Sequence, residues 1–205
     1  MLHIGAMTTR SVMVSWGGRK RKWLDTQVSG GSRPLSWKRL LLEWSMPVVS
    51  ICVYSCTKLL TKAAYFTGEA QHPTKVVNFD FYYMHELNSS IFFSTFARQP
   101  WISTTNKVKL LEWKGRLDLC QYASRHCPPL RLEEIIDYVP KVAQSDWNLI
   151  FERARAFNDD GHGCKVIRAL AHGERVCAPY EGNPKFRIQG KMWLQLANMG
   201  KSLSS

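Results

Sequence analysis

The sequence predicts an all-α fold: an irregular helical array with a poorly ordered N-terminal segment. From about residue 46 onward, apolar residues recur at alternating spacings of three and four, the period of an amphipathic helix. No run alternates for long enough to indicate a strand, and clusters of Gly and Pro divide the chain into helix-sized pieces. With 205 residues, 45% of them hydrophobic, one domain with a sizeable core is expected.

Residues 1–47 show no sustained period of either kind. Turn formers interrupt this segment at Gly17-Gly18, Gly30-Gly31 and Pro34. Disordered tails are usually poor in aromatic residues, yet this one holds four tryptophans, namely Trp16, Trp23, Trp37 and Trp44. We therefore interpret residues 1–47 as disordered or mis-annotated, and residues 48–205 as the helical part of the chain.

Two helices are predicted before Pro100. The first covers Met46 to Phe66 and is expected to end at Thr67-Gly68. The second begins after a cap at Asn78 or Asp80, because a short polar side chain there can accept the first free backbone N–H groups. Its apolar residues at helical spacing are Met84, Leu87, Ile91, Phe92 and Phe96.

A longer helix is predicted from a cap at Thr104 or Thr105 to about Tyr122. Its apolar face is expected to consist of Val108, Leu111, Gly115, Leu119 and Tyr122. Glu112 with Arg116, and Lys114 with Asp118, are expected to form outward ion pairs four residues apart. Pro128-Pro129 ends this helix, and a short acidic helix is predicted from Leu132 to Tyr138.

The last long helix is predicted to start at a cap formed by Ser145 and Asp146. Its in-register positions are Ile150, Ala154, Phe157, Gly161, Cys164 and Arg168. Gly161 and Gly163 lie inside it, each costing about 1 kcal/mol relative to Ala, so a packing or functional reason for them is expected. A loop rich in Pro and Gly then leads to a final short helix from Lys191 to Met199.

The formal net charge of +12 lies mostly at the front of the chain. Residues 1–78 carry 11 Lys and Arg against 3 acids, while residues 79–205 carry 17 against 13. The densest run, Arg19 to Lys22, suits a nuclear-localisation or polyanion-binding patch, but such runs are more often solvated. A nucleic-acid partner is therefore not expected.

Cysteine usage and hydropathy favour a cytoplasmic protein without a membrane span. The six cysteines lack the paired C-x-x-C and His spacing of a zinc site, so buried free thiols are expected. No convincing secretory signal opens the chain. The most apolar stretch, Met46 to Leu60, is too short to cross a bilayer.

The first candidate site lies in the sequence Asp159-Asp160-Gly161-His162. On a continuous helix, Asp159 and His162 would project from the same face, an arrangement that suits a metal ligand pair or an acid–base pair. Carboxylate-x-x-His occurs in carboxylate-bridged metal bundles, but those use Glu and repeat the motif. The alternative is that the acids interact with nearby cations while Gly161 lets another helix approach.

The second candidate is His85, which Asn88, Ser89 and Phe92 follow along one side of its helix. It can serve as a base, a ligand or a donor to substrate, or it can be a hydrogen-bonded core histidine. The surrounding aromatic residues suit either a pocket for a flat polycyclic substrate or an ordinary core. These residues are Phe79, Phe81, Tyr82, Tyr83, Phe92, Phe93 and Phe96.

Common cofactor and hydrolase motifs are missing from the sequence. It contains no G-x-G-x-x-G after a strand, no P-loop, no G-x-S-x-G and no kinase signature. Local motifs therefore support neither a Rossmann nucleotide site nor a familiar hydrolase.

Several segments, in order along the chain, resemble the questin oxidase-like family. The resemblance covers roughly Val76 to Met199 and is specific because chance agreement at each segment must multiply. The segments are Asn78–His85, Asn88–Phe93, Gln99–Ser103, Leu111–Leu119, Asp159–His162 with Lys165, Ile167–Leu170 and Met192–Leu194.

The resemblance implies an oxidoreductase of fungal polyketide metabolism. It implies an NADPH-dependent, Baeyer–Villiger-type ring oxidation with dioxygen, acting on an aromatic substrate similar to an anthraquinone. It assigns no residue to NADPH, and it leaves the use of a metal or flavin open. Members of the family are longer, with additional histidine-rich helical segments in their front part, so this chain resembles the C-terminal part of the family.

The sequence thus nominates His85, Asp159 and His162 for proton transfer or ligation near an aromatic substrate. Two other hypotheses remain open. The chain can be a non-catalytic remnant of a truncated family gene, or a basic binding module that acts through its front segment.

Overall fold

The computed structural model describes residues 50–71, 75–140, 142 and 146–200. All regular elements in these residues are helical, which confirms the all-α prediction for this part of the chain. Residues 1–47, with the basic run Arg19 to Lys22, lie outside the described residues. The interpretation of this segment therefore stays a prediction. Within the described part, no helix is both long and apolar enough to cross a membrane.

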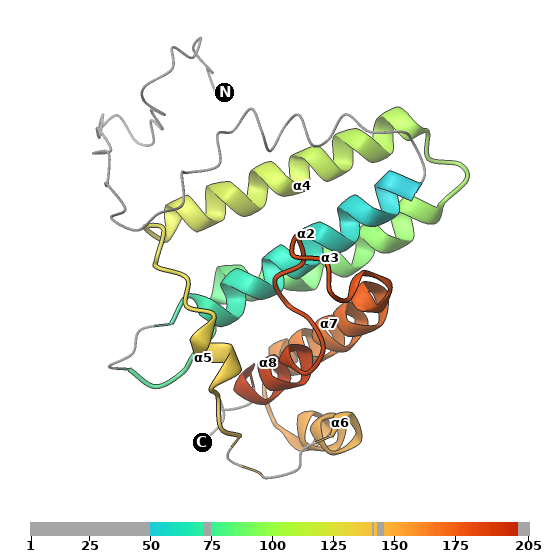
Figure 1. Cartoon of the computed structure of the whole chain (residues 1–205). Coiled ribbons are helices and arrows are strands. Elements are labelled where there is room, and N and C mark those ends of the chain that lie inside the picture. The colour runs from blue at the N-terminus through green and yellow to red at the C-terminus, as the bar shows by residue number, and fades with distance from the viewer. Residues whose placement is uncertain (1–49, 72–74, 141, 143–145, 201–205) are drawn as a thin grey trace. The chain divides into compact units, whose positions relative to one another are not determined.

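Three long helices form one side of the array (Figure 1). Helix α2 (Ser50–Glu69) packs along α3 (Phe81–Arg98), and α4 (Thr104–Ser124) contacts both. Helix α7 (His162–Cys177) packs against α2 and α3, and α8 (Met192–Gly200) packs mainly against α7. The remaining elements are shorter: α5 (Glu133–Ile136), α6 (Trp147–Ala156) and the 3-10 turn η1 (Ala178–Tyr180).

The main core lies where α2, α7 and α8 meet. Trp193 of α8 is fully buried there together with Leu60 of α2 and Leu170 of α7. A Cβ added to Gly173 of α7 would lie 2.4 Å from the Trp193 ring and 2.7 Å from Leu60. Gly173 therefore allows these helices to approach one another closely.

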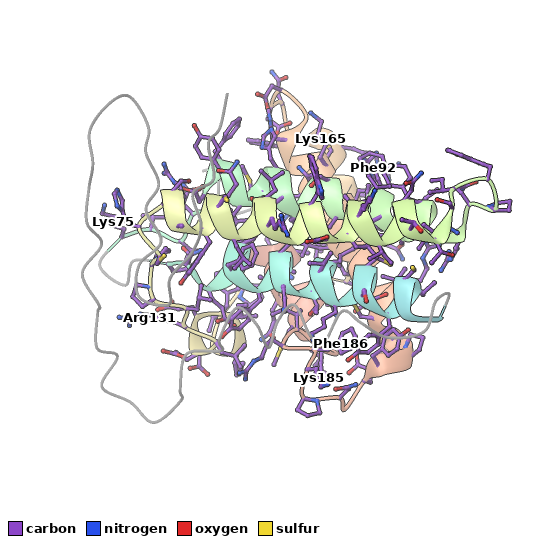
Figure 2. The ribbon with its side chains drawn as sticks, turned by 90° about the horizontal axis from the view of Figure 1, so that it is seen from above. Lys75, Phe92, Arg131, Lys165, Lys185 and Phe186 are labelled. Carbon is purple, nitrogen blue, oxygen red and sulfur yellow. The ribbon has the colours of Figure 1, made fainter. Side chains whose placement is uncertain are left out.

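The loop before α8 closes the same core. In this loop, which runs from η1 to α8, Phe186 and Ile188 are buried and Lys185 is exposed. Figure 2 shows Lys185 and Phe186 next to each other. The Phe186 ring stacks on Tyr180 at a centroid distance of 4.8 Å. The backbone N–H of Ile188 donates to the Thr61 hydroxyl of α2 at 3.2 Å, which ties the loop to the long helices.

Several helix ends follow the sequence prediction because their caps are local. Asp80 caps α3 and Asp146 caps α6, each through its carboxylate. The cap of α4 is Ser103, one residue before the predicted Thr104. Helix α8 begins at Met192 and ends at Gly200, each one residue later than predicted.

The predicted end of the first helix at Thr67-Gly68 is wrong. Helix α2 continues through both residues to Glu69. The Thr67 hydroxyl donates to the Ala63 carbonyl at 2.7 Å, so it bonds within the helix. A Cβ on Gly68 would collide with Leu196 of α8 and with Ile135 of α5. Gly68 is therefore a close packing point within the helix.

The predicted continuous helix from residue 145 to Arg168 is also wrong. Helix α6 ends at Ala156, and α7 starts only at His162. Gly161, the N-cap of α7, has a φ of 86°, a left-handed conformation that glycine adopts without strain. The glycine expected to serve packing thus forms a turn between two helices.

The cysteines are all free thiols, but only Cys52, Cys56 and Cys177 are buried. Cys120, Cys127 and Cys164 are exposed, so the expectation of buried thiols holds for half of them. Burial raises the pKa of the Cys56 thiol to about 11. This keeps it protonated at neutral pH.

Candidate functional site

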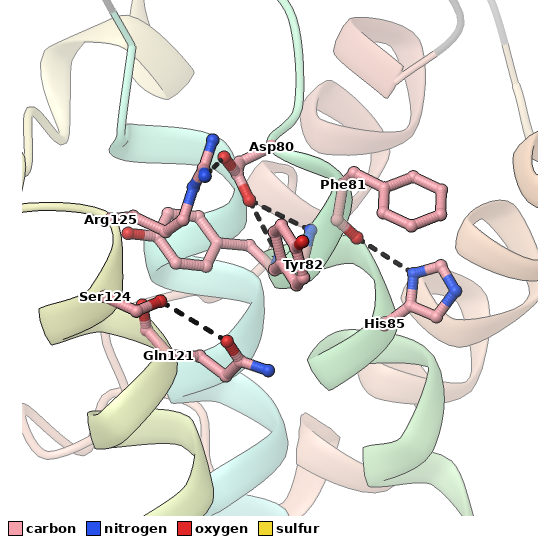
Figure 3. A network of polar contacts seen from close by, with 8 residues as sticks. Asp80, Phe81, Tyr82, His85, Gln121, Ser124 and Arg125 are labelled. Carbon is pink, nitrogen blue, oxygen red and sulfur yellow. Dashed lines mark hydrogen bonds and ion pairs between the residues drawn. The ribbon is translucent and has the colours of Figure 1, made fainter. Parts of the chain in front are cut away.

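The start of α3 is fixed by Asp80, as Figure 3 shows. One carboxylate oxygen of Asp80 accepts the backbone N–H of Tyr82 at 2.9 Å, and the other accepts Arg125 Nε at 2.7 Å. Arg125 follows the end of α4, and its guanidinium also lies 5.2 Å from the centre of the Tyr82 ring. The first turn of α3 is therefore tied to the end of α4, which orients Phe81 and His85.

The exposed imidazole of His85 has a defined hydrogen-bond pattern. Its Nδ1 lies 2.9 Å from the carbonyl oxygen of Phe81, one turn earlier (Figure 3). A carbonyl oxygen can only accept, so Nδ1 carries the hydrogen in this contact. In the neutral ring, Nε2 is then left with a lone pair and can accept a proton.

The second imidazole, His162, opens α7 and contacts Asp160. Its Nδ1 hydrogen-bonds the Asp160 carboxylate, which leaves Nε2 as the acceptor in the neutral ring. The bond to His162 holds the pKa of the Asp160 carboxyl below its usual range. A carboxylate that accepts the Nδ1 hydrogen in this way fixes the tautomer of the imidazole and orients Nε2 as a base.

Asp159 does not pair with His162. Its two carboxylate oxygens accept the backbone N–H groups of Gly161 and Gly163, each at 2.7 Å. The expectation that Asp159 and His162 share one helix face is wrong, because the chain turns at Gly161 between them. Asp159 instead holds the turn from which His162 projects.

The two histidines come together from different helices. Their ring centroids are 5.1 Å apart, and Phe81 lies 4.4 Å from the His85 ring and 5.2 Å from the His162 ring. We refer to Phe81, His85 and His162 as the ring cluster. The pocket for a flat substrate that the sequence suggested around His85 is not enclosed, because His85 is exposed and the Phe81 side chain is 53% exposed.

The aromatic residues that flank His85 in sequence separate in space. Phe79 and Tyr83 are buried in the main core, and Tyr83 packs against Phe66. Phe92, labelled in Figure 2, is exposed elsewhere on α3. Phe81 is the residue of this set that joins both imidazoles. The ring cluster thus offers two proton acceptors beside one exposed aromatic face.

The ring cluster does not amount to a metal centre. In the part of the chain that the structure describes, no group of three or more His, Cys, Asp and Glu side chains is placed to hold a metal ion.

A second group of ionisable residues lies inside the array, between α3 and α4. Glu86, Lys114 and Asp118 are each less than 5% exposed. Lys114 Nζ hydrogen-bonds Asp118 Oδ1. The predicted i,i+4 pair exists, but the expectation that it points outward is wrong, because α4 turns this side toward α2 and α3. We refer to these three residues as the buried acid group.

Glu86 and Asp118 bring two carboxyl groups close enough to affect each other's pKa. Both Glu86 oxygens and Asp118 Oδ2 are shielded from solvent, and none of the three has a hydrogen-bond partner among the described residues. Two buried carboxyl groups repel one another when both are ionised, so one of them tends to keep its proton. Burial raises the pKa of the Glu86 carboxyl, and the Asp118 charge raises it further. Glu86 is therefore the neutral partner.

Comparison with known proteins decides the family. A family model described as questin oxidase-like matches residues 33–170. The chain belongs to the questin oxidase-like family. The match begins earlier than the resemblance at Val76, and it includes part of the segment 1–47.

Curated members of the questin oxidase-like family are much longer than this chain. Oxidoreductase AflY of Aspergillus parasiticus is 46% identical over 142 residues, which are 69% of this chain and 29% of that protein. Baeyer-Villiger oxidase ptaJ of Pestalotiopsis fici is 45% identical, over 67% of this chain and 32% of its own. Questin oxidase of Aspergillus fumigatus is 36% identical, over 74% and 35%. The chain spans about a third of these relatives.

Both residue groups lie inside the matched third of the questin oxidase-like family. Sequence reasoning missed Asp160 as the partner of His162, and it missed the buried acid group. A signal for the latter was available, since Leu111, Lys114 and Asp118 follow one another by three and four residues. That spacing places the ion pair on the same face as the predicted core residue Leu111.

Proposed function

We propose that this chain belongs to an oxidoreductase of fungal secondary metabolism that carries out a Baeyer–Villiger-type oxidation of a polycyclic aromatic polyketide similar to an anthraquinone. Membership of the questin oxidase-like family and the names of relatives, a Baeyer-Villiger oxidase and a questin oxidase, support the reaction class. The observation that carries the assignment to residues is the 5.1 Å approach of the His85 and His162 rings.

In this proposal the ring cluster handles protons beside the substrate. In this reaction, dioxygen reduced by two electrons adds to a carbonyl carbon as a peroxide. The O–O bond then breaks, one oxygen atom enters between the carbonyl carbon and its neighbour, and the other leaves as water. A proton therefore leaves the attacking peroxide oxygen, and another reaches the oxygen that departs as water. Two imidazoles whose Nδ1 positions are occupied can serve as acceptor and donor through Nε2. The Phe81 face provides apolar contact for a flat ring system. Asp160 and Asp159 act as positioning residues for His162.

NADPH, which the family resemblance implies as the reductant, does not fit the described residues. Their regular elements are all helices, so they form no strand–turn–helix cradle for a dinucleotide. The N-terminus of α7 could attract a phosphate, but Asp159 already occupies the N–H groups of Gly161 and Gly163. NADPH dependence is therefore proposed for the complete oxidoreductase, and no residue of the described part is assigned to NADPH.

One observation also favours the alternative of a non-catalytic remnant: the ring cluster is open to solvent on the described part, where the Phe81 side chain is 53% exposed. A site that needs walls from elsewhere in the family domain would bind substrate weakly here. Catalysis and binding must therefore be measured separately.

The experiment uses the purified chain with NADPH and an anthraquinone, and it follows NADPH and oxygen consumption. The proposal is supported if the chain shows turnover and if His162→Ala and His85→Ala each abolish it. Lys165→Ala, at an exposed position on α7, should retain turnover. No consumption above the His162→Ala background would remove the catalytic claim for this chain. Histidine NMR signals that shift with the anthraquinone in the absence of turnover would favour a remnant that still binds.

A further inference from the structure

The outer face of α4 is apolar and open to solvent. Leu110, Trp113 and Leu117 follow one another by three and four residues and are 39%, 71% and 53% exposed. At this spacing the three side chains form one stripe along the helix. Scattered exposed apolar residues are ordinary, but a continuous stripe that includes a tryptophan is typical of an interaction surface.

The inner side of α4 makes this stripe unusual. It buries the ion pair Lys114–Asp118 next to Leu111, so the helix encloses charges and exposes large apolar groups. A helix at a protein surface has the opposite arrangement. Apolar residues on the outer side are expected if α4 lies between two layers in the complete protein.

A shallow apolar notch lies beside the stripe, between α3 and α4. It is lined by Phe93, Phe96, Ala97, Lys107, Leu110 and Leu111. Lys107 and Lys109 place positive charge along the same helix. A helix with an apolar face and acidic flanks would fit this surface, because its side chains could enter the notch and its carboxylates could approach the lysines.

The lengths of the relatives indicate what packs on the α4 stripe. The matched region makes up 29% of AflY and 32% of ptaJ, and α4 lies wholly within the family match. Helices α2 and α3 already pack against each other and against α4 and α7. The rest of a family member must bury its own apolar surface, and the α4 stripe is a large apolar surface left free on the described part.

We propose that the stripe Leu110, Trp113 and Leu117 is the surface on which the remaining two thirds of a questin oxidase-like domain packs. The proposal rests on the family match and the geometry of α4, and it does not depend on the proposed reaction. It makes α4 a central layer of the complete domain.

The test is coexpression of this chain with the part of AflY that lies outside the matched 142 residues, so that neither has to fold in advance. The tagged chain should capture this AflY segment. Trp113→Glu and Leu117→Glu should reduce the captured amount by about tenfold or more, as expected for residues at the centre of an interface. Val139→Glu, at a side chain 82% exposed away from the stripe, should capture as much as the unaltered chain.

Thermal unfolding of each variant alone checks that the chain remains folded. Absence of capture by the unaltered chain overturns the proposal, and so does equal capture by Trp113→Glu. Sedimentation of the chain alone tests a second copy as the occupant. The proposal would also be overturned if the chain forms a dimer that Trp113→Glu dissociates and does not capture the AflY segment.

Discussion

Glu86 on α3 and Asp118 on α4 bring two buried carboxyl groups together inside the helical array, and burial raises the pKa of both. Lys114 compensates the single negative charge that this arrangement leaves on Asp118. Lys62 of α2 also lowers the pKa of Asp118, although burial dominates and leaves it raised. A neutral Glu86 and the Lys114–Asp118 ion pair together limit the unpaired charge that this group buries.

Glu86→Gln should flatten the dependence of stability on pH. The folded-state pKa of Glu86 is raised above the ordinary 4.5, so its contribution to stability is complete below that value and is lost as pH rises toward the folded pKa. A glutamine amide can donate to Asp118 at every pH, so the cost at neutral pH should stay below about 1 kcal/mol. Urea unfolding from pH 5 to 9 measures both effects.

Part of the slope should remain in Glu86→Gln. Burial raises the pKa of Glu69 to about 8, and Glu69 is fully buried in the last turn of α2. Identical slopes for the original chain and the Glu86→Gln variant would show that Glu86 is ionised in the folded state.

Asp118→Ala should destabilise the protein by about 3–5 kcal/mol, because it leaves the Lys114 charge buried without its partner. Replacing both residues, Lys114→Met with Asp118→Leu, should cost much less, since no charge is then left alone. Denaturant midpoints of the two variants provide the comparison. A double variant that is less stable than Asp118→Ala would contradict this account of the pair.

Gly173→Ala should destabilise the protein by about 1–3 kcal/mol through overpacking at the Trp193 ring. The methyl group would lie far closer to the ring than van der Waals contact allows, and the fully buried Trp193 has little room to move. Thermal unfolding measures the loss. An unchanged or higher midpoint would indicate that α7 and α8 are less closely packed.

Phe81→Ala should weaken binding of an anthraquinone, whereas Phe92→Ala should not. The two side chains lie on the same helix and are 53% and 52% exposed, so they are matched in chemistry and accessibility. Only Phe81 contacts both imidazoles. Equal losses in a fluorescence titration would place the aromatic ligand away from the ring cluster.

Asp159→Ala should cost about 1 kcal/mol, since it removes the acceptor of two backbone N–H groups at the start of α7. Asp160→Ala should cost less stability, because its carboxylate is exposed and mainly contacts His162. If His162 needs the Asp160 carboxylate, turnover should show the opposite order, with a larger loss for Asp160→Ala than for Asp159→Ala. Chemical unfolding and oxygen consumption, measured side by side, separate the two roles.

Much of the fold could be predicted from the sequence because its signals are local. Asp80 and Asp146 cap helices wherever the chain packs, since each bonds N–H groups two or three residues away. The ordered segments from Asn78 onward indicated the family in the same way, because they depend on residue order alone.

Tertiary structure decided that the Lys114–Asp118 side of α4 is enclosed. Periodicity groups Lys114 and Asp118 on one face of α4, but only the position of α2 and α3 makes that face internal. Likewise, the turn at Gly161 places Asp160 within hydrogen-bond distance of His162. It also places the His162 ring beside His85, a residue 77 positions earlier in the chain. Burial and long-range contact depend on packing between distant elements, which no local pattern encodes.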